Sequence, residues 1–222
     1  MLQVLYFCGC KTFYQNLTTK KTIYLIRHGE TEYNKRGIIQ GSGIDSDLNE
    51  TGHLQAKLFH MAYKHISFDK IYVSELKRTF QSVEPFIKTR TLHEKLPELN
   101  EINWGIMEGS IPTRFNQILY SQMIEDWKQG YLDKAIDNGE SPNDMYKRQK
   151  LGLKTIMSKE NEKTILICMH GRAIRSFLCL LLDEPLKLME EFKHSNLCLY
   201  VLEQTEDVKF KTLVENSTEH LW

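Results

Sequence analysis

Residues 22–34 read TIYLIRHGETEYN, and this stretch decides the fold. Residues 22–27 are mostly apolar on both faces of an extended chain, which is typical of a central strand in a parallel sheet. A histidine and a glycine follow directly, and the glycine-containing loop that they begin runs to residue 47. The stretch therefore predicts a buried strand that delivers a histidine to one edge of a sheet.

A second stretch, 164–171, repeats the pattern as TILICMHG. It again combines a buried strand with a histidine and a glycine. In open α/β sheets, ligands bind at the carboxyl ends of the strands, near the point where the strand order reverses. His28 and His170 are therefore expected to meet in one site.

Strand-like and helix-like stretches alternate along the rest of the chain, which is typical of a layered α/β domain. Further strands are expected at 68–74 and 91–96, and an antiparallel pair at 197–214. Helices are expected after Asn49 and at 74–88, 111–136, 144–159 and 173–182. The pattern predicts a three-layer open α/β sheet, mostly parallel with an antiparallel C-terminal edge. Helices are expected on both faces, with a small helical cap at about 110–140.

The helix after Asn49 has a start signal and an apolar stripe. Asn49 suits the N-cap, where its side-chain oxygen can accept a hydrogen bond from the first helical turn. The stripe that helical spacing places on one side, and that is expected to face the core, consists of Leu54, Leu58, Met61 and Ala62.

The chain is interpreted as one domain, 21–222, preceded by an extension at 1–20. The extension contains the short apolar stretch LQVLYFCGC. An extra strand or an irregular segment is the favoured interpretation, and a lipoprotein-type signal ending at Cys10 is the alternative. No run elsewhere approaches the ~20 apolar residues needed to span a bilayer.

Charge and cysteine usage narrow the class of protein. The chain has 29 Lys and Arg against 29 Asp and Glu, so no net field attracts nucleic acid or a membrane, and neither is an expected partner. An anion must be bound by a local cluster. Cysteines number five, with no C-x-x-C, and Cys168, Cys179 and Cys198 lie in apolar runs. Buried free thiols are expected, which favours a reducing compartment and a cytoplasmic location.

The residues of the first motif suit phosphoryl transfer. An imidazole such as His28 can attack phosphorus and form a covalent intermediate, which divides one difficult step into two easier ones. Arg27 can bind phosphoryl oxygens, and Gly29 lets the backbone approach them closely. Asn34 can donate a further hydrogen bond.

Several spaced motifs resemble those of the histidine phosphatase superfamily, the phosphoglycerate mutase-like proteins. They occur in the order found in the family and cover about 21–202. They are RHGETEYN at 27–34, QG at 40–41 with GHLQA at 52–56, SELKRT at 74–79, LNEINWG at 99–105 with EG at 108–109, and MHG at 169–171.

The resemblance implies a role for each matched residue. It implies a phosphohistidine on His28, clamps on the phosphate from Arg27 and Arg78, and a second histidine, His170, that donates to a phosphoryl oxygen. Glu101 would protonate the leaving oxygen and afterwards activate water. The substrate-binding residues would be Asn34, Gln40, Gly41 and Gly171. No cluster of carboxylates or cysteines suits a metal, so neither metal nor cofactor is expected.

Taken outside the motifs, some of these residues have a plainer interpretation. Arg78 alone would be a solvated helix arginine, and Glu101 an exposed loop carboxylate. Glu140 and Ser141 resemble the family's G-E-S turn, but a plain polar turn is nearly as well supported. The loop at 41–45 has one residue more than the commonest family spacing.

Two features favour a phosphomonoesterase of the histidine acid phosphatase type over a mutase. Residues 106–109 read IMEG, similar to the W-E-G of phosphatase branches, whereas cofactor-dependent mutases usually have L-Q-G. The segment from 109 to 141 is also compact, and a mutase needs a larger cap to keep water from the phosphohistidine. The expected partner is a small phosphorylated metabolite. Whether the protein is a monomer or a dimer stays open.

Two alternatives remain. One is phosphoryl transfer of the cofactor-dependent phosphoglycerate mutase type. The other is a catalytically silent phosphate-binding or scaffold protein on the same fold, because a fold does not fix a function. Silent relatives typically lose the nucleophile, an arginine or the acid, and this chain keeps all three.

Overall fold

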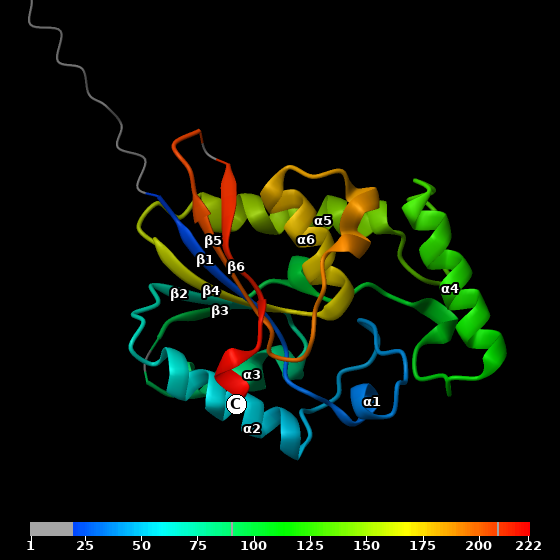
Figure 1. The fold of residues 1–222 in the computed structure, drawn as a ribbon, viewed down its shortest axis with the longest axis horizontal. Helices are drawn as coiled ribbons and strands as arrows, with labels where there is room; N and C mark the ends of the chain where they lie inside the picture. The colour runs from blue at the N-terminus through cyan, green and yellow to red at the C-terminus, as the bar shows by residue number, and fades with distance from the viewer. Residues whose placement is uncertain (1–19, 90, 208) are drawn as a thin grey trace, which may run out of the picture.

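Six strands form one sheet in the computed structural model, which describes residues 20–89, 91–207 and 209–222 (Figure 1). The strands are β1 (Thr22–Arg27), β2 (Lys70–Val73), β3 (His93–Lys95), β4 (Thr164–Met169), β5 (Leu199–Gln204) and β6 (Phe210–Ser217). Their order is β3-β2-β4-β1-β5-β6. The first four are parallel, and β5 and β6 are antiparallel to their neighbours. The predicted sheet, with its antiparallel C-terminal edge, is confirmed.

The helices also follow the predicted order: α3 and α4 are shorter than predicted, whereas α5 and α6 begin two residues earlier than predicted. The α-helices are α1 (Glu32–Lys35), α2 (Glu50–Tyr63), α3 (Lys77–Lys88), α4 (Arg114–Lys128), α5 (Pro142–Met157) and α6 (Gly171–Leu182). Short 3₁₀ helices are η1 (Pro97–Leu99), η2 (Gly105–Met107), η3 (Leu186–Glu191) and η4 (Glu219–Leu221). None of the helices in the described ranges is long and apolar enough to cross a membrane.

Two cores, one on each face of the sheet, make the molecule three-layered. Along β1, Ile23 and Leu25 join the cluster that α5 and α6 cover, whereas Ile26 joins the one that α2 and α3 cover. Successive strand residues point to opposite faces, so a strand covered on both sides is apolar throughout. Cys168, Cys179 and Cys198 are buried free thiols, as predicted; Cys8 and Cys10, with the rest of the expected extension up to residue 19, lie outside the described residues.

The predicted inner face of α2 is wrong. Asn49 caps the helix as expected, with its side chain accepting a hydrogen bond from the backbone N–H of Gly52 (2.9 Å). However, Leu54 and Met61 are both 55% exposed. The buried face is made by Gly52, Ala56 and Phe59.

The reason is a close approach of the backbone at the start of α2. A Cβ on Gly52 would lie 2.2 Å from the carbonyl oxygen of Glu30, so this side of the helix packs directly on the loop after β1. That contact fixes the rotation of the helix and turns Phe59 inward. The Leu54 stripe, on another face, is left in solvent.

Neighbouring strand ends bring three motifs to one edge of the sheet. Arg27 at the end of β1 pairs with Met169 at the end of β4. The backbone N–H of His28 donates to the carbonyl oxygen of Met169 (3.0 Å). β2 ends on the other side of β4. The rings of His28 and His170 consequently lie 5.2 Å apart, as the two matching stretches predicted. In Figure 1, α4 stands beyond this edge, on the side to which β1 and β4 point.

Candidate active site

His28 is a neutral imidazole with one nitrogen already bonded. Its side chain is 3% exposed, and Nδ1 lies 2.7 Å from the carbonyl oxygen of Gly29, which can only accept, so Nδ1 carries the proton. Burial holds the His28 pKa well below its usual value, and the charges of Arg78 and Arg27 lower it further. The remaining nitrogen, Nε2, therefore keeps the lone pair that a nucleophile needs.

His170 lies behind His28 and is fully buried. Its Nδ1 accepts a hydrogen bond from Arg78 Nε (3.2 Å), so Nε2 carries the proton and donates to Ser74 Oγ (2.8 Å). Burial, followed by the charge of Arg78, holds the His170 pKa well below its usual value. Both ring nitrogens are engaged, so donation to a phosphoryl oxygen requires an exchange of partner.

Arg78 leaves the second position of α3 and is fully buried. Its Nη1 donates to the carbonyl oxygen of Ile44 (2.6 Å) and its Nη2 to that of Gly41 (3.2 Å). Burial lowers the Arg78 pKa to about 10, so the guanidinium stays charged at neutral pH. The residue thus ties the loop at 41–45 to the two histidines.

Gln40 links that loop to the first motif. Its amide lies among Thr31, Ser46 and Arg78. In the orientation that satisfies all three, the nitrogen donates to Thr31 Oγ1 (2.8 Å) and the oxygen accepts from Arg78 Nη1 (2.9 Å). Gly41 contributes a carbonyl oxygen to Arg78, and a Cβ there would lie 2.0 Å from a carboxylate oxygen of Glu108.

Arg27, at the end of β1, is the cation nearest the nucleophile in sequence. Its Nη1 lies 3.3 Å from His194 Nδ1, and its Nε is buried without a hydrogen-bond partner. Asn34, in α1, accepts hydrogen bonds through Oδ1 from Thr31 N (3.3 Å) and from Asn196 Nδ2 (3.1 Å). An unpartnered guanidinium N–H beside a nucleophile is suited to a phosphoryl oxygen.

Glu101 is held by three backbone N–H groups. They belong to Ile102 (3.0 Å), Arg172 (3.0 Å) and Ala173 (2.8 Å), the last two in the first turn of α6. The N-terminus of a helix is a natural site for a carboxylate, because the free N–H groups and the helix dipole both favour negative charge. The side chain is 6% exposed and reaches the same cavity as His28.

A cavity of about 380 Å³ joins these groups. Of the nine residues that the sequence singled out, six line it: Arg27, His28, Asn34, Gln40, Glu101 and Gly171. Arg78, His170 and Gly41 lie behind this wall. The other wall comes from the segment at 104–121 and includes Trp104, Ser110, Asn116, Gln117, Tyr120 and Ser121.

Several residues that line the cavity were not expected from the sequence, and two of them, His194 and Arg172, have basic side chains. His194 follows η3; burial lowers its pKa to about 2, and Arg27 adds to the effect, so it is neutral. No motif surrounds it, so nothing local identified it. Arg172 did have a signal, since it directly follows the second histidine motif. Its guanidinium pairs with Glu190 and donates to Tyr120 Oη (2.7 Å).

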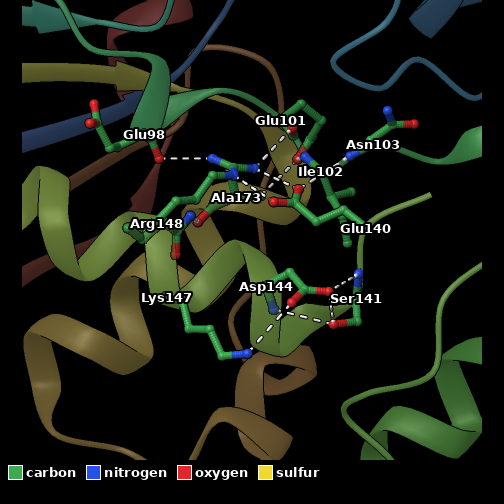
Figure 2. A network of polar contacts seen from close by, with 11 residues as sticks. Glu98, Glu101, Ile102, Asn103, Glu140, Ser141, Asp144, Lys147, Arg148 and Ala173 are labelled. Carbon is green, nitrogen blue, oxygen red and sulfur yellow. Dashed lines mark hydrogen bonds and ion pairs between the residues drawn. The ribbon is translucent and has the colours of Figure 1, made fainter. Parts of the chain in front are cut away.

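The ion pair between Arg148 and Glu140 fixes the backbone at Glu101 and next to it (Figure 2). Arg148 donates from Nε and Nη2 to the two carboxylate oxygens of Glu140 (2.7 and 2.8 Å). The same guanidinium donates to the carbonyl oxygens of Glu98 (2.8 Å) and Glu101 (3.1 Å). Glu140 belongs to the turn that resembles the family's G-E-S element, which here is more than a plain polar turn. Ser141 caps α5, with Oγ accepting from Asp144 N (3.2 Å).

Within the described residues, no group of three or more His, Cys, Asp or Glu side chains is arranged to hold a metal ion. The charges around the cavity come instead from guanidinium groups and from Glu101. This arrangement can bind one anion at Arg27, offer a neutral imidazole beside it, and supply a carboxylate for proton transfer.

Comparison with known proteins agrees with the geometry. Residues 23–217 match the model of the histidine phosphatase superfamily (branch 1). A probable phosphatase from Schizosaccharomyces pombe is 46% identical over 113 residues, which are 49% of this chain and 52% of that protein. The fructose-2,6-bisphosphatase TIGAR B of Danio rerio is 31% identical, over 68% of this chain and 57% of that protein. The match thus spans little more than half the length of these two relatives.

Among solved structures, a mutant phosphoserine phosphatase from Entamoeba histolytica in complex with phosphoserine has a TM-score of 0.79 and 26% identity. The likeness covers 91% of this chain and 100% of that one. The α/β arrangement is therefore shared with a phosphatase over most of the chain.

Proposed function

This chain belongs to branch 1 of the histidine phosphatase superfamily, and on that basis we propose that it hydrolyses phosphomonoesters through a phosphohistidine on His28. The observation that carries the proposal is the state of His28. Its Nδ1 proton is held by Gly29 O and its Nε2 is unprotonated, in a cavity that also contains Arg27 and Glu101. A nucleophile, a cation and a proton donor are the three parts that this reaction needs.

In the first step His28 Nε2 attacks phosphorus, and the bond from phosphorus to the ester oxygen breaks. The protonated Glu101 gives its proton to that oxygen, which leaves as an alcohol. The three backbone N–H groups stabilise the carboxylate, so Glu101 takes up this proton only with the substrate bound, when the phosphate dianion beside it repels the negative charge. Arg27 neutralises the phosphoryl oxygens, and Arg78 adds positive charge from behind His170.

In the second step water attacks the phosphohistidine. Glu101, now ionised, takes a proton from this water, the P–N bond breaks, and inorganic phosphate leaves. His170 serves as a further donor if it exchanges Ser74 for a phosphoryl oxygen. Asn34, Gln40 and Gly171 line the phosphate end of the cavity, and Gly41 acts from behind it by accepting a hydrogen bond from Arg78.

Hydrolysis is favoured over the mutase alternative by the segment at 110–140, which we interpret as a small cap. It contributes one helix, α4, whose residues on the cavity side have no charge. A mutase must hold a bisphosphate in two orientations, and a second phosphate needs a second cationic site. We propose a small phosphorylated metabolite as the substrate. We propose the cytoplasm as the location, because free thiols such as Cys168, Cys179 and Cys198 are typical of a reducing compartment.

The test is release of phosphate from p-nitrophenyl phosphate in excess chelator. Wild-type protein is expected to turn over without added metal, and His28→Ala to lose at least about a thousandfold in rate. His53→Gln, on the exposed side of α2, is the matched histidine control and is expected to retain full activity. Equal rates for wild type and His28→Ala would refute the nucleophile. Inactivation by chelator would refute the metal-independent mechanism, and a folded but inactive wild type would favour the mutase or silent alternatives.

A further inference from the structure

The wall opposite His28 consists of uncharged hydrogen-bonding groups. Asn116, Gln117, Tyr120 and Ser121 occupy one face of the first turns of α4 and line the cavity, and Ser110 lies just before the helix. The charged residues of α4 do not line it. Asn116 Nδ2 already donates to the carbonyl oxygen of Ile111 (3.0 Å), so Asn116 offers its Oδ1 as an acceptor. A substrate that reaches this wall therefore meets amides and hydroxyls, which bind hydroxyl groups as donors or acceptors.

The guanidinium on this side, that of Arg172, is already occupied. It pairs with Glu190, donates to Tyr120 Oη, and lies over the rings of Trp104 and Trp127 (5.8 and 5.5 Å to the centroids). A carboxylate or second phosphate of a substrate would have to displace Glu190 to reach it. Arg172 therefore holds the aromatic side chains beside the cavity in place and is not free to bind a substrate anion.

The end of the cavity beside His28, where the phosphate would bind, has a guanidinium that is not fully occupied. Arg27 Nε is buried without a partner, so this guanidinium is available to a ligand. His194 is uncharged and adds no second cation. Glu101, between the two ends, repels any anion other than the one that Arg27 and Arg78 compensate. The charges thus provide for one anionic group only.

We propose that the substrate is the phosphate monoester of an uncharged polyhydroxy alcohol, such as a sugar or polyol, whose hydroxyl groups bind to Asn116, Gln117 and Ser121. This inference rests on the proposed function. A cavity of about 380 Å³ is large enough for one such molecule. Phosphorylated carboxylic acids and bisphosphates are disfavoured, because no free cation at this wall would compensate their second anion.

The test compares kcat/KM for four substrates. Glucose 6-phosphate and glycerol 3-phosphate represent the uncharged alcohols, and phosphoserine and 3-phosphoglycerate represent the carboxylates. Wild type is expected to prefer the first pair by about tenfold or more. A preference for either carboxylate would overturn the inference. Turnover of p-nitrophenyl phosphate, measured in parallel, reports the proposed function separately.

Variants of α4 test whether its side of the cavity selects the substrate. Asn116→Ala with Ser121→Ala is expected to lower kcat/KM for glucose 6-phosphate about tenfold, with p-nitrophenyl phosphate changed less than about threefold. Phe115→Ala, on the same helix but 73% exposed, is the matched control and is expected to change neither. Gln117→Arg, which adds a free cation, is expected to shift the preference towards phosphoserine. Equal losses on all substrates would contradict a role of α4 in selection.

A different observation, the ion pair behind Glu101, carries a second inference. Arg148 binds the carbonyl oxygens of Glu98 and Glu101 while Glu140 holds its guanidinium from the other side (Figure 2). Glu140 also accepts from Asn103 N (3.4 Å). Residues on both sides of Glu101 are thus fixed to α5, while its carboxylate is fixed to α6.

We infer that Arg148 is a positioning residue for Glu101 and acts only on the steps in which Glu101 moves a proton. The inference rests on Glu101 as the proposed acid, and the leaving group provides its signature. An aryl phosphate releases a stable phenolate and needs little protonation, whereas an alkyl phosphate needs a proton from Glu101.

The test measures Arg148→Lys and Glu140→Gln on p-nitrophenyl phosphate and on glycerol 3-phosphate. The quantity compared is kcat/KM, which reports the transfer to His28 and not the later attack of water that both substrates share. Both variants are expected to lower kcat/KM about tenfold or more for the alkyl ester and less than about threefold for the aryl ester. Arg148→Lys is expected to have no further effect on the alkyl rate in a Glu101→Gln background. Lys147→Ala, which removes the exposed pair with Asp144 on the same helix, is the control and is expected to change neither rate.

Equal losses on both substrates would show a general structural role and overturn the positioning inference. Multiplicative losses in the double variant would do the same. If Glu101→Gln itself lowered kcat/KM equally for both substrates, the acid assignment in the proposed function would fail instead.

Discussion

At the scale of single residues, burial and positive charge together set the protonation state of His28. Both effects disfavour the imidazolium, because a desolvated cation beside Arg78 and Arg27 is costly. Proton placement follows from the bond to Gly29 O, which leaves Nε2 free. The residue is therefore ready as a nucleophile across a pH range in which an ordinary histidine titrates.

We expect His28 to stay neutral from pH 7.5 down to pH 5.5, in the Nδ1–H tautomer. ¹⁵N-histidine NMR distinguishes the two tautomers and the cation, and His28→Asn assigns the signal. The expected result is an unchanged pair of ring nitrogen shifts over this range. A titration midpoint near the ordinary value of about 6.5 would show that the burial seen here does not control the group.

At the scale of elements, α2 shows what periodicity can and cannot decide. Residues 52, 56 and 59 and residues 54, 58 and 61 both satisfy helical spacing. The second set is the more apolar, so the sequence favoured it. What decides is tertiary: Gly52 approaches the backbone of Glu30, which no local pattern reports.

Substitutions on the two faces of α2 are expected to differ strongly in cost. Phe59→Ala, at a fully buried ring that contacts Tyr63 and Phe86, should lower the free energy of unfolding by about 3–5 kcal/mol. Leu54→Ala should change it by about 0.5 kcal/mol or less. Urea unfolding of both variants checks this, and similar losses for the two would restore the original interpretation of the helix.

The positions of site residues at strand ends could be predicted from the sequence, whereas those of residues on helices or loops were harder to predict. The reason is physical. His28 and His170 follow apolar runs, and parallel strands of one sheet end at the same edge, so local sequence determined their meeting. Asn116 and Ser121 resemble ordinary surface residues of a helix. Arg148 likewise resembles a solvated helix arginine. Their roles depend on how α4 and α5 pack on the rest, which is set by long-range contacts.

At the scale of the whole molecule, three histidines at the site make stability depend on pH. His28 and His170 are buried, and His194 is half-buried. The pKa values of His28, His170 and His194 are all lowered, mainly by burial. The unfolded chain binds protons at these positions below about pH 6.5, whereas the folded chain does not. The stability is therefore complete above pH 6.5 and is lost as the pH falls below it.

We expect the free energy of unfolding to fall by about 4 kcal/mol between pH 7 and pH 5.5, at about 1.3 kcal/mol for each of the three histidines. His194→Gln should reduce this decrease by one histidine's share, and His53→Gln, on an exposed position, should leave it unchanged. Urea unfolding at the two pH values measures it. Equal stability at both would mean that the histidines take up protons in the folded protein.

A phosphohistidine on His28 can be trapped and located on the chain. Glu101→Gln should slow the attack of water more than the transfer from an aryl phosphate, so the phosphoenzyme accumulates. After rapid alkaline quenching of this variant with p-nitrophenyl phosphate, peptide mass spectrometry is expected to find phosphate on the peptide that contains His28. None should remain in His28→Ala with Glu101→Gln. If no phosphate is found on this peptide, or if the double variant has as much phosphate there, His28 does not form a phosphohistidine.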